Sequence, residues 1–326
     1  KAALAQFIGK ETVTADGVKV ELCANIGKPE DVDKVLQYDG EGVGLFRTEF
    51  LFMDRTAMPT EEEQFEAYKK VAIALNGKPV IIRTLDIGGD KEIPYMGLEK
   101  DENPFLGYRA IRLCLDRKED IYKPQLRALL RASAYGNIRI MIPLVTCIDE
   151  LREAKALIEE IKAELDEKNI AYKKDIQVGI MVETAAASLI ADIFAKEADF
   201  FSIGTNDLTQ YTMSVDRGNK KVSYLYSTFN PAVLRSIRHI IACGREAGIM
   251  VGMCGEAASD PMMIPLLLAF GLNEFSMSAS AILRARKMVT EYSVEELQAV
   301  ADKAMSFATT AEVEDYMRKF VEKITG

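Results

Sequence analysis

The sequence predicts an α/β fold in which eight parallel strands close into a (β/α)8 TIM barrel with extra C-terminal helices. Eight strand-like segments alternate with helix-like segments along the chain. The strand-like segments are apolar runs with little alternation, which is typical of a parallel sheet buried on both faces. Reactive side chains follow the predicted strands, and barrel enzymes carry their active sites at that end of the strands.

The predicted elements cover most of the chain in regular order. The expected strands span residues 18–24, 42–46, 79–87, 138–145, 177–182, 199–204, 249–253 and 274–278. The expected helices span residues 29–38, 60–76, 104–116, 119–135, 149–168, 185–196, 208–214, 231–247, 261–270, 281–289, 294–308 and 311–324. A Thr-Glu-Glu-Glu run at residue 60 favours a helix start there, and residues 90–103 are expected to form a loop. No low-complexity linker interrupts this order, so we expect one domain over residues 1–326.

Composition limits the classes of partner. The chain has 326 residues and a formal net charge of −9, which argues against nucleic acid as a main partner. No apolar run approaches the ~20 residues of a membrane span and no signal peptide is recognisable, so no membrane partner is expected. The five cysteines are widely spaced without a C-x-x-C pair, which indicates reduced thiols and a cytoplasmic location. The first residue is Lys1 rather than Met, so we expect a fragment in which residues 1–15 end a connection from an N-terminal part.

Charged side chains gather where the predicted strands end. Four arginines there could donate paired hydrogen bonds to phosphate or carboxylate oxygens: Arg47, Arg83, Arg109 and Arg217. Glu183 and Asp207 offer the hard oxygen ligands that suit Mg²⁺. This pattern favours a site for a metal-bound anion. Salt bridges between these same groups at the rim, or an ordinary helix cap at Asn206 or Asp207, are the alternatives.

One cysteine lies where chemistry is expected. Cys254 ends a predicted strand in the run Gly-Met-Cys-Gly-Glu, and flanking glycines let a ligand approach the backbone closely. Its thiol could act as a nucleophile or as an acid–base group, and a buried bystander is the alternative. The single histidine, His239, falls in the middle of a predicted helix and is interpreted as a helix-face residue without chemistry.

Several runs of residues resemble one family over nearly the whole chain. They are GVGLFRTEFLF at 42–52, IIRTLDIGGDK at 81–91, ENPFLGYRAIR at 102–112, MVET at 181–184, DFFSIGTNDLTQY at 199–211, VDRGN at 215–219, GMCGE at 252–256 and NEFSMS at 273–278. The chain thereby resembles the C-terminal, phosphoenolpyruvate-binding domain of enzyme I of the bacterial phosphotransferase system, the phosphoenolpyruvate–protein phosphotransferases.

The resemblance implies a role for each candidate residue. The implied substrate ligands are Arg47, Arg83, Arg109, Asn206, Asp207 and Arg217. Glu183 and Asp207 would hold Mg²⁺. Cys254 would be the acid–base that acts on the methylene carbon of the pyruvate enolate.

The resemblance also implies a reaction and partners. The phosphoryl group of phosphoenolpyruvate would pass to a histidine and leave pyruvate, as the first step of sugar phosphotransfer. That histidine would lie in a separate N-terminal domain, in a G-G-x-x-S-H-type run that this sequence lacks. A small histidine phosphocarrier would dock on the same missing part, and the barrel itself would form a homodimer.

Three alternatives stay open at this point. Pyruvate phosphate dikinase and phosphoenolpyruvate synthase share the barrel and a C-G-E signature. A non-catalytic module that senses phosphoenolpyruvate and dimerises would use the same binding residues. An aldolase or lyase on a related barrel would also use Mg²⁺ and an enolate.

Overall fold

Eight parallel strands close into a barrel, so the predicted fold class is confirmed. The computed structural model describes residues 2–88 and 93–325, so residues 90–92 of the predicted loop lie outside that description, as does residue 89 before it. Each strand pairs with the next along the chain, and the last pairs with the first. The strands are β1 (Glu21–Ile26), β2 (Val43–Phe46), β3 (Val80–Arg83), β4 (Ile138–Ile142), β5 (Val178–Val182), β6 (Phe200–Ile203), β7 (Met250–Met253) and β8 (Glu274–Met277).

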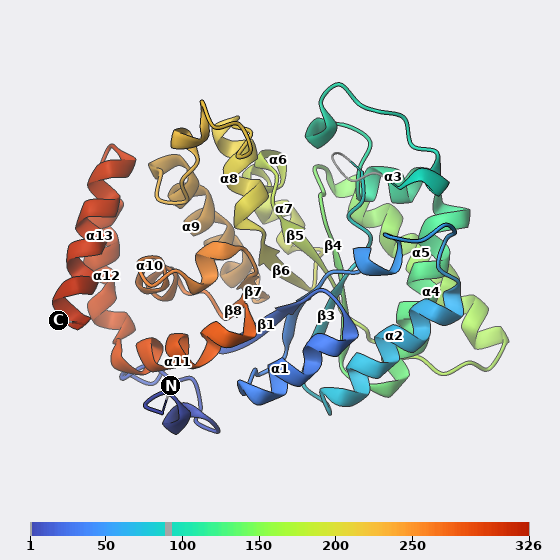
Figure 1. Cartoon of the computed structure of the whole chain (residues 1–326), viewed down its shortest axis with the longest axis horizontal. Helices are drawn as coiled ribbons and strands as arrows, with labels where there is room; N and C mark the ends of the chain where they lie inside the picture. The colour runs from blue at the N-terminus through green and yellow to red at the C-terminus, as the bar shows by residue number, and fades with distance from the viewer. Residues whose placement is uncertain (1, 89–92, 326) are drawn as a thin grey trace.

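Helices surround the barrel on its outer side (Figure 1). They are α1 (Val32–Gln37), α2 (Glu61–Ala74), α3 (Ile111–Asp116), α4 (Lys123–Ala132), α5 (Ile148–Glu167), α6 (Ala185–Leu189), α7 (Ala191–Ala195), α8 (Thr205–Met213), α9 (Pro231–Glu246), α10 (Ile264–Phe270), α11 (Ile282–Glu291), α12 (Val294–Ala304) and α13 (Thr310–Thr325). The predicted extra helices are α12, which packs on α10, and α13, which lies outermost in Figure 1. Within the described parts of the chain, no helix has the length and apolar character needed to span a bilayer.

Two boundaries differ from prediction in ways that matter for the site. The third strand ends at Arg83 instead of continuing to residue 87. The helix after β6 begins at Thr205 instead of residue 208, because the Leu208 N–H already bonds to the Gly204 carbonyl at 3.0 Å. Asn206 and Asp207 therefore lie in the first turn of α8, directly after the strand.

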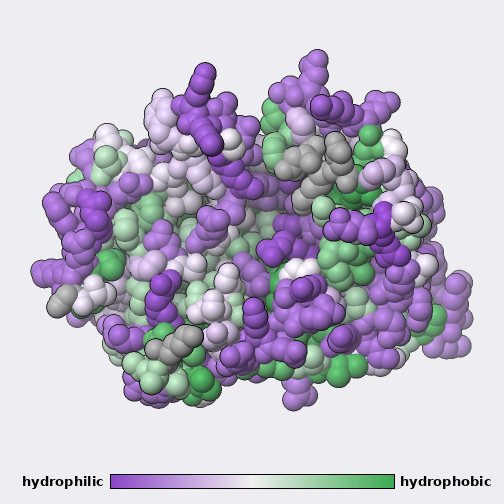
Figure 2. Space-filling view, in the orientation of Figure 1, coloured by the Kyte–Doolittle hydropathy of each residue, from purple (hydrophilic) through white to green (hydrophobic). Residues whose placement is uncertain are grey.

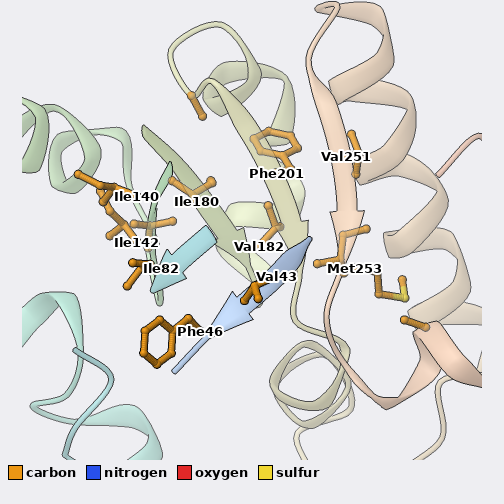
Figure 3. Packing of buried hydrophobic residues seen from close by; sticks show 14 of the residues in the cluster. Val43, Phe46, Ile82, Ile140, Ile142, Ile180, Val182, Phe201, Val251 and Met253 are labelled. Atoms are coloured by element: carbon orange, nitrogen blue, oxygen red, sulfur yellow. The ribbon is translucent and has the colours of Figure 1, made fainter. Parts of the chain in front are cut away.

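The strands bury both faces, and the two faces have different contents. The outer face packs against the helices through apolar side chains, and Figure 3 shows this layer with Phe46, Ile82, Ile140 and Phe201. A second, smaller cluster faces the lumen of the barrel and consists of Leu45, Ile81, Met141, Met181, Phe200 and Cys254. Burial on both faces explains why the strand sequences are continuous apolar runs.

Glycines make room for polar side chains in the lumen. A Cβ at Gly44 would lie 2.4 Å from the Ser276 Oγ and 2.7 Å from the Glu274 Oε1. A Cβ at Gly252 would lie 3.0 Å from the carboxyl group of Glu274. Any larger residue at Gly44 would therefore displace the side chains of Ser276 and Glu274, which fill the barrel interior.

Glu274 supplies a pH-dependent test of this lumen. Burial raises the pKa of Glu274 to about 8, with Glu21 adding to the rise and Arg139 opposing it. The raised pKa means that its contribution to stability is fully present below the ordinary value of 4.5 and is lost as the pH rises to about 8. We expect Glu274→Gln to flatten the decline in unfolding free energy over that window, which amounts to ~1.4 kcal/mol per pH unit for one such group. Urea unfolding between about pH 5 and pH 8 measures it, and an unchanged slope in the variant would contradict it.

The N-terminal segment packs against the barrel through a buried arginine. Arg286 of α11 is fully buried and donates hydrogen bonds to the Phe7 carbonyl, the Thr12 hydroxyl and the Asp39 carboxylate, at 3.0, 3.0 and 2.6 Å. The described part of residues 1–15 is therefore attached to the body of the domain. That these residues end a connection from another part stays a prediction.

Candidate functional site

All eight predicted site residues line one cavity of about 250 Å³ at the C-terminal ends of the strands. They are Arg47, Arg83, Arg109, Glu183, Asn206, Asp207, Arg217 and Cys254. Two long connections reach this end, one after β3 and one between α8 and α9, and both lie at the top of Figure 1. Figure 2 shows a mostly hydrophilic face with an indentation between these two lobes.

Strand alternation brings three of these side chains to the mouth of the lumen. Arg83 lies two residues beyond the lumen-facing Ile81, and Glu183 lies two beyond Met181. Cys254 follows Gly252 in the same way. Side chains at positions i and i+2 of a strand share a face, so these groups point into the barrel next to the cavity.

Arg83 is held by carboxylates. Its Nη2 lies 2.6 Å from the Glu49 Oε1, and its Nη1 lies 3.5 Å from the Asp86 Oδ2. Burial works against the charge of Arg83, but Glu49, Asp86 and Glu183 outweigh burial and raise its pKa. The guanidinium is therefore charged and fixed in direction, which suits the binding of an anion in a defined position.

Arg109 contacts two carboxylates, a hydroxyl group and an aromatic ring. Its Nη2 lies 2.9 Å from the Asp86 Oδ1 and 3.4 Å from the Asp207 Oδ2. Its Nη1 donates to the Tyr211 hydroxyl at 3.1 Å, and the Phe105 ring lies 5.5 Å from the guanidinium carbon. Burial is outweighed by the nearby carboxylates, which raise the pKa of Arg109.

Arg47 and Arg217 differ from these two because they are exposed. The Arg217 side chain is 42% exposed, and its Nη1 lies 3.5 Å from the Asp207 Oδ1. Arg47 makes no ion pair with any residue that the structure describes. The cavity thus combines two buried, ion-paired guanidinium groups with two exposed ones.

Glu183 lines the same cavity, and one of its carboxylate oxygens has no hydrogen-bond partner among the described residues. It is 2% exposed, and the oxygen without a partner in the described chain is Oε1. Burial raises the pKa of Glu183, and the charges of Asp207 and Asp86 add to the rise. A Cβ at Gly204 would lie 2.9 Å from the Met181 Sδ and 3.1 Å from the Glu183 Oε2, so a larger residue there would press on both side chains.

The carboxylates suit a hard cation that takes its other ligands from elsewhere. In the described ranges, no group of three or more histidine, cysteine, aspartate or glutamate side chains is arranged to hold a metal. Glu183 and Asp207 are two carboxylates beside one cavity, and the orphaned Glu183 oxygen is what a bound cation would satisfy. Mg²⁺ is commonly held in this way, by one or two carboxylates together with water and substrate oxygens.

Cys254 contributes a buried thiol to the cavity lining. It is 6% exposed, and its Sγ lies 3.8 Å from the Ile203 carbonyl. Burial raises the pKa of Cys254 to about 12, despite opposing effects of Ser202 and Arg83. The thiol therefore keeps its proton near neutral pH, as a proton donor requires.

Hydrogen bonds fix the backbone around Cys254. The Asn25 side-chain amide donates to the Cys254 carbonyl at 2.9 Å, and its oxygen accepts from Ser276 at 2.6 Å. The Asn206 side-chain oxygen accepts from the Glu256 N–H at 3.1 Å. Asn206 thus has a structural bond in addition to its predicted role as a substrate ligand.

The remaining reactive candidates lie outside the cavity. His239 lies on the exposed face of α9, and Cys243 is its near neighbour at 3.6 Å. All five cysteines are free thiols, and Cys147 is the exposed one. His239 therefore fits its interpretation as a helix-face residue.

Sequence reasoning did not assign the residues that orient the arginines. Glu49 and Asp86 stand next to predicted strand ends, so their position was a usable signal. Phe105 and Tyr211 lie far apart in sequence and meet only in the fold, so no local signal could have paired them.

The fold and the cavity define a class, a (β/α)8 barrel with an arginine- and carboxylate-lined pocket at the end where barrel enzymes act. Residues 1–294 match the family model of the PEP-utilising enzyme, PEP-binding domain. The chain belongs to this family, which confirms at family level the resemblance seen in its motifs.

Curated relatives carry one name. The chain is 54% identical over 318 residues to the phosphoenolpyruvate-protein phosphotransferase of Priestia megaterium, covering 98% of this chain and 55% of the relative. The proteins of that name from Bacillus subtilis and Staphylococcus carnosus are each 54% identical, over 98% and 99% of this chain and 56% of each relative. The chain spans about half the length of the curated relatives it matches.

A solved structure supports the fold alone. A citrate lyase from Burkholderia xenovorans aligns with a TM-score of 0.52 over 95% of this chain and 94% of that chain. The sequence identity is 14%, so the likeness extends to the barrel architecture and no further.

Proposed function

We propose that this chain is the phosphoenolpyruvate-binding barrel of a phosphoenolpyruvate–protein phosphotransferase, which transfers the phosphoryl group to a histidine of a separate domain and leaves pyruvate. The observation that carries the proposal is the convergence of four arginines, two carboxylates and Cys254 on one cavity. The name shared by relatives at 54% identity supports it.

The arginines act by neutralising charge. Phosphoryl transfer leaves little covalent work to the protein, because positioning and electrostatic stabilisation supply most of the catalysis. Arg83 and Arg109 are fixed by their carboxylates and bind the phosphoryl oxygens in a defined direction. Arg47 and Arg217 are exposed and complete the shell around the ligand when it enters.

Mg²⁺ is the proposed cofactor, with Glu183 and Asp207 as its protein ligands. When bound, the ion neutralises charge on the phosphoryl group and on the enolate. The two carboxylates line the same cavity as Arg83 and Arg109, so the cation and the guanidinium groups would bind oxygens of the same ligand.

Cys254 manages the proton on the methylene carbon. Once the phosphoryl group has left, the enolate carbon accepts the thiol proton, so that an S–H bond breaks and a C–H bond forms. The high pKa of Cys254 keeps this proton available near neutral pH. In the reverse direction the thiolate removes a proton from pyruvate.

The proposed partners are those that a phosphoenolpyruvate–protein phosphotransferase requires. They are phosphoenolpyruvate and pyruvate, a histidine-bearing domain with its small phosphocarrier, and a second copy of the barrel, in the cytoplasm. Apolar side chains exposed near α9 support the homodimer. Leu189 of α6 is 77% exposed, Ile193 of α7 is 42% exposed, and Tyr224, between α8 and α9, is 78% exposed. Burial of these side chains against a second copy would remove apolar surface from water, as the core of a protein–protein interface does.

Calorimetry of phosphoenolpyruvate binding tests the proposal directly. We expect the chain to bind phosphoenolpyruvate more tightly with Mg²⁺ than without it, and to unfold at higher temperature when the ligand is present. Glu183→Gln should lose most of the Mg²⁺ dependence, because it removes a charged ligand of the ion. Glu274→Gln is the matched control, since Glu274 is equally buried in the lumen but does not line the cavity.

Two results would contradict the assignment. Unchanged Mg²⁺ dependence in Glu183→Gln would remove the metal site. Binding without phosphoryl transfer to an added histidine-bearing domain would favour a sensing module over an enzyme.

A further inference from the structure

A second cavity adjoins the site. It measures about 440 Å³ and is lined by two segments, residues 102–106 after β3 and residues 210–216 at the end of α8. Phe105 lines both this outer cavity and the 250 Å³ site cavity. Phe105 therefore lies where the two spaces adjoin, and we call it the partition residue.

The turn that carries Phe105 is held by three hydrogen bonds from two side chains, Tyr211 and Arg112. The Tyr211 hydroxyl donates to the Phe105 carbonyl. Arg112 donates to the Leu106 carbonyl at 3.1 Å and to the Gly107 carbonyl at the same distance. The partition residue thus has a fixed backbone, and the size of its side chain decides how far the site cavity extends.

Space for a larger side chain is also excluded at the end of the turn. The Asp101 carboxylate accepts from the Tyr108 N–H at 3.0 Å. A Cβ at Gly107 would lie 2.3 Å from that carboxylate, so a larger residue there would displace the Asp101 side chain from its bond to Tyr108.

The partition residue is joined to a substrate arginine. The Phe105 ring lies 5.5 Å from the Arg109 guanidinium carbon, and Arg109 donates to Tyr211. Tyr211 thus contacts both Arg109 and the backbone of the turn. Movement of the ring would open the site cavity beside a group that holds the ligand.

We propose that Phe105, held in place by Tyr211, is a specificity residue that restricts the site to a three-carbon enol phosphate. The inference rests on the proposed function. Phe105 lines both the site cavity of about 250 Å³ and the outer cavity of about 440 Å³, so a smaller side chain at this position is expected to connect them. The joined space accommodates an enol phosphate with an alkyl group on its methylene carbon.

The test compares two ligands in three variants by calorimetry with Mg²⁺. The ligands are phosphoenolpyruvate and its homologue with an ethyl group on the methylene carbon, as each geometric isomer. Phe105→Ala is expected to raise the affinity for the homologue relative to phosphoenolpyruvate by roughly tenfold or more, in line with the discrimination that one or two methylene groups give in a pocket. Tyr211→Phe, which keeps the ring but frees the turn, is expected to shift the ratio in the same direction and by less.

Leu106→Ala is the matched control. Leu106 lies on the same turn and is 67% exposed, and it lines only the outer cavity. Its replacement should leave the affinity ratio unchanged. If Phe105→Ala does not fold, as judged by thermal unfolding, Phe105→Leu provides the smaller side chain instead.

The outcomes separate this inference from the proposed function. A Phe105 variant that binds phosphoenolpyruvate and rejects the homologue as strongly as the wild type overturns the specificity role. An equal gain in Leu106→Ala overturns it as well. A wild-type chain that binds no phosphoenolpyruvate overturns the proposed function and this inference with it.

Discussion

Replacement of Arg83 with alanine is expected to remove most phosphoenolpyruvate binding and to destabilise the barrel as well. Loss of one charged hydrogen bond costs ~1.5–3 kcal/mol, or roughly tenfold or more in affinity. Arg83 also balances the buried Glu49 at 2.6 Å. Breaking a buried pair by removing one partner costs about 3–5 kcal/mol of folding stability, and Arg83→Ala removes the ion pair that Glu49 makes with Arg83.

Arg47→Ala is the matched comparison for this prediction. Arg47 is exposed and makes no ion pair within the described residues, so its loss should reduce ligand affinity with little change in stability. Calorimetry and urea unfolding of both variants measure the two effects separately. Wild-type affinity in both folded variants would remove the anion site from this cavity.

Replacement of Cys254 with alanine is expected to leave phosphoenolpyruvate binding nearly intact while stopping most turnover. The arginines that hold the phosphoryl group are unchanged in this variant. The proton donor to the methylene carbon is lost, and general acid–base groups typically contribute 10²–10⁴-fold to rate. Exchange of the pyruvate methyl protons with deuterated water, followed by NMR, reports on this step without the histidine domain.

Cys243→Ala controls for loss of a buried thiol. Cys243 lies on α9, is 9% exposed and does not line the cavity, so proton exchange should match the wild type. Phosphoryl transfer to an added histidine-bearing domain gives a second readout. Equal exchange and transfer in Cys254→Ala and the wild type would make Cys254 a bystander.

The barrel could be predicted because each strand is buried on both faces. A strand buried on both faces requires a continuous run of apolar residues. Eight such runs separated by helical segments are compatible with few architectures other than a closed barrel. The ends of the elements were less predictable. The apolar stretch beyond Arg83 continues through Leu85 and Ile87, both fully buried, yet it leaves the strand ladder at Arg83. Hydrophobicity reports burial, whereas the strand end depends on pairing with a neighbouring strand.

The candidate site was predictable to the same extent. Arg83 and Glu183 follow strands, and parallel strands bring all such positions to one end of a barrel. The orientation of those side chains was not predictable. It depends on contacts across the mouth, such as Glu49 with Arg83 and Tyr211 with Phe105, which join segments with no periodic relation in the sequence. Asn206 illustrates the limit, because its side chain also bonds to the Glu256 backbone.

The close contacts of Gly44 and Gly252 in the lumen limit how the sequence of this barrel can change during evolution. A methyl group at Gly44 would collide with Ser276, and one at Gly252 would press on Glu274, so a change at either glycine requires its neighbour to shift. The neighbouring residues Ser276 and Glu274 are also constrained. A smaller residue at position 276, for example, would leave an empty space beside Gly44. Substitutions in the barrel interior are therefore expected to occur in pairs, one at the glycine and one at the side chain that contacts it. Such double steps are rare, and they would appear among homologues as covariation between positions 44 and 276 and between positions 252 and 274.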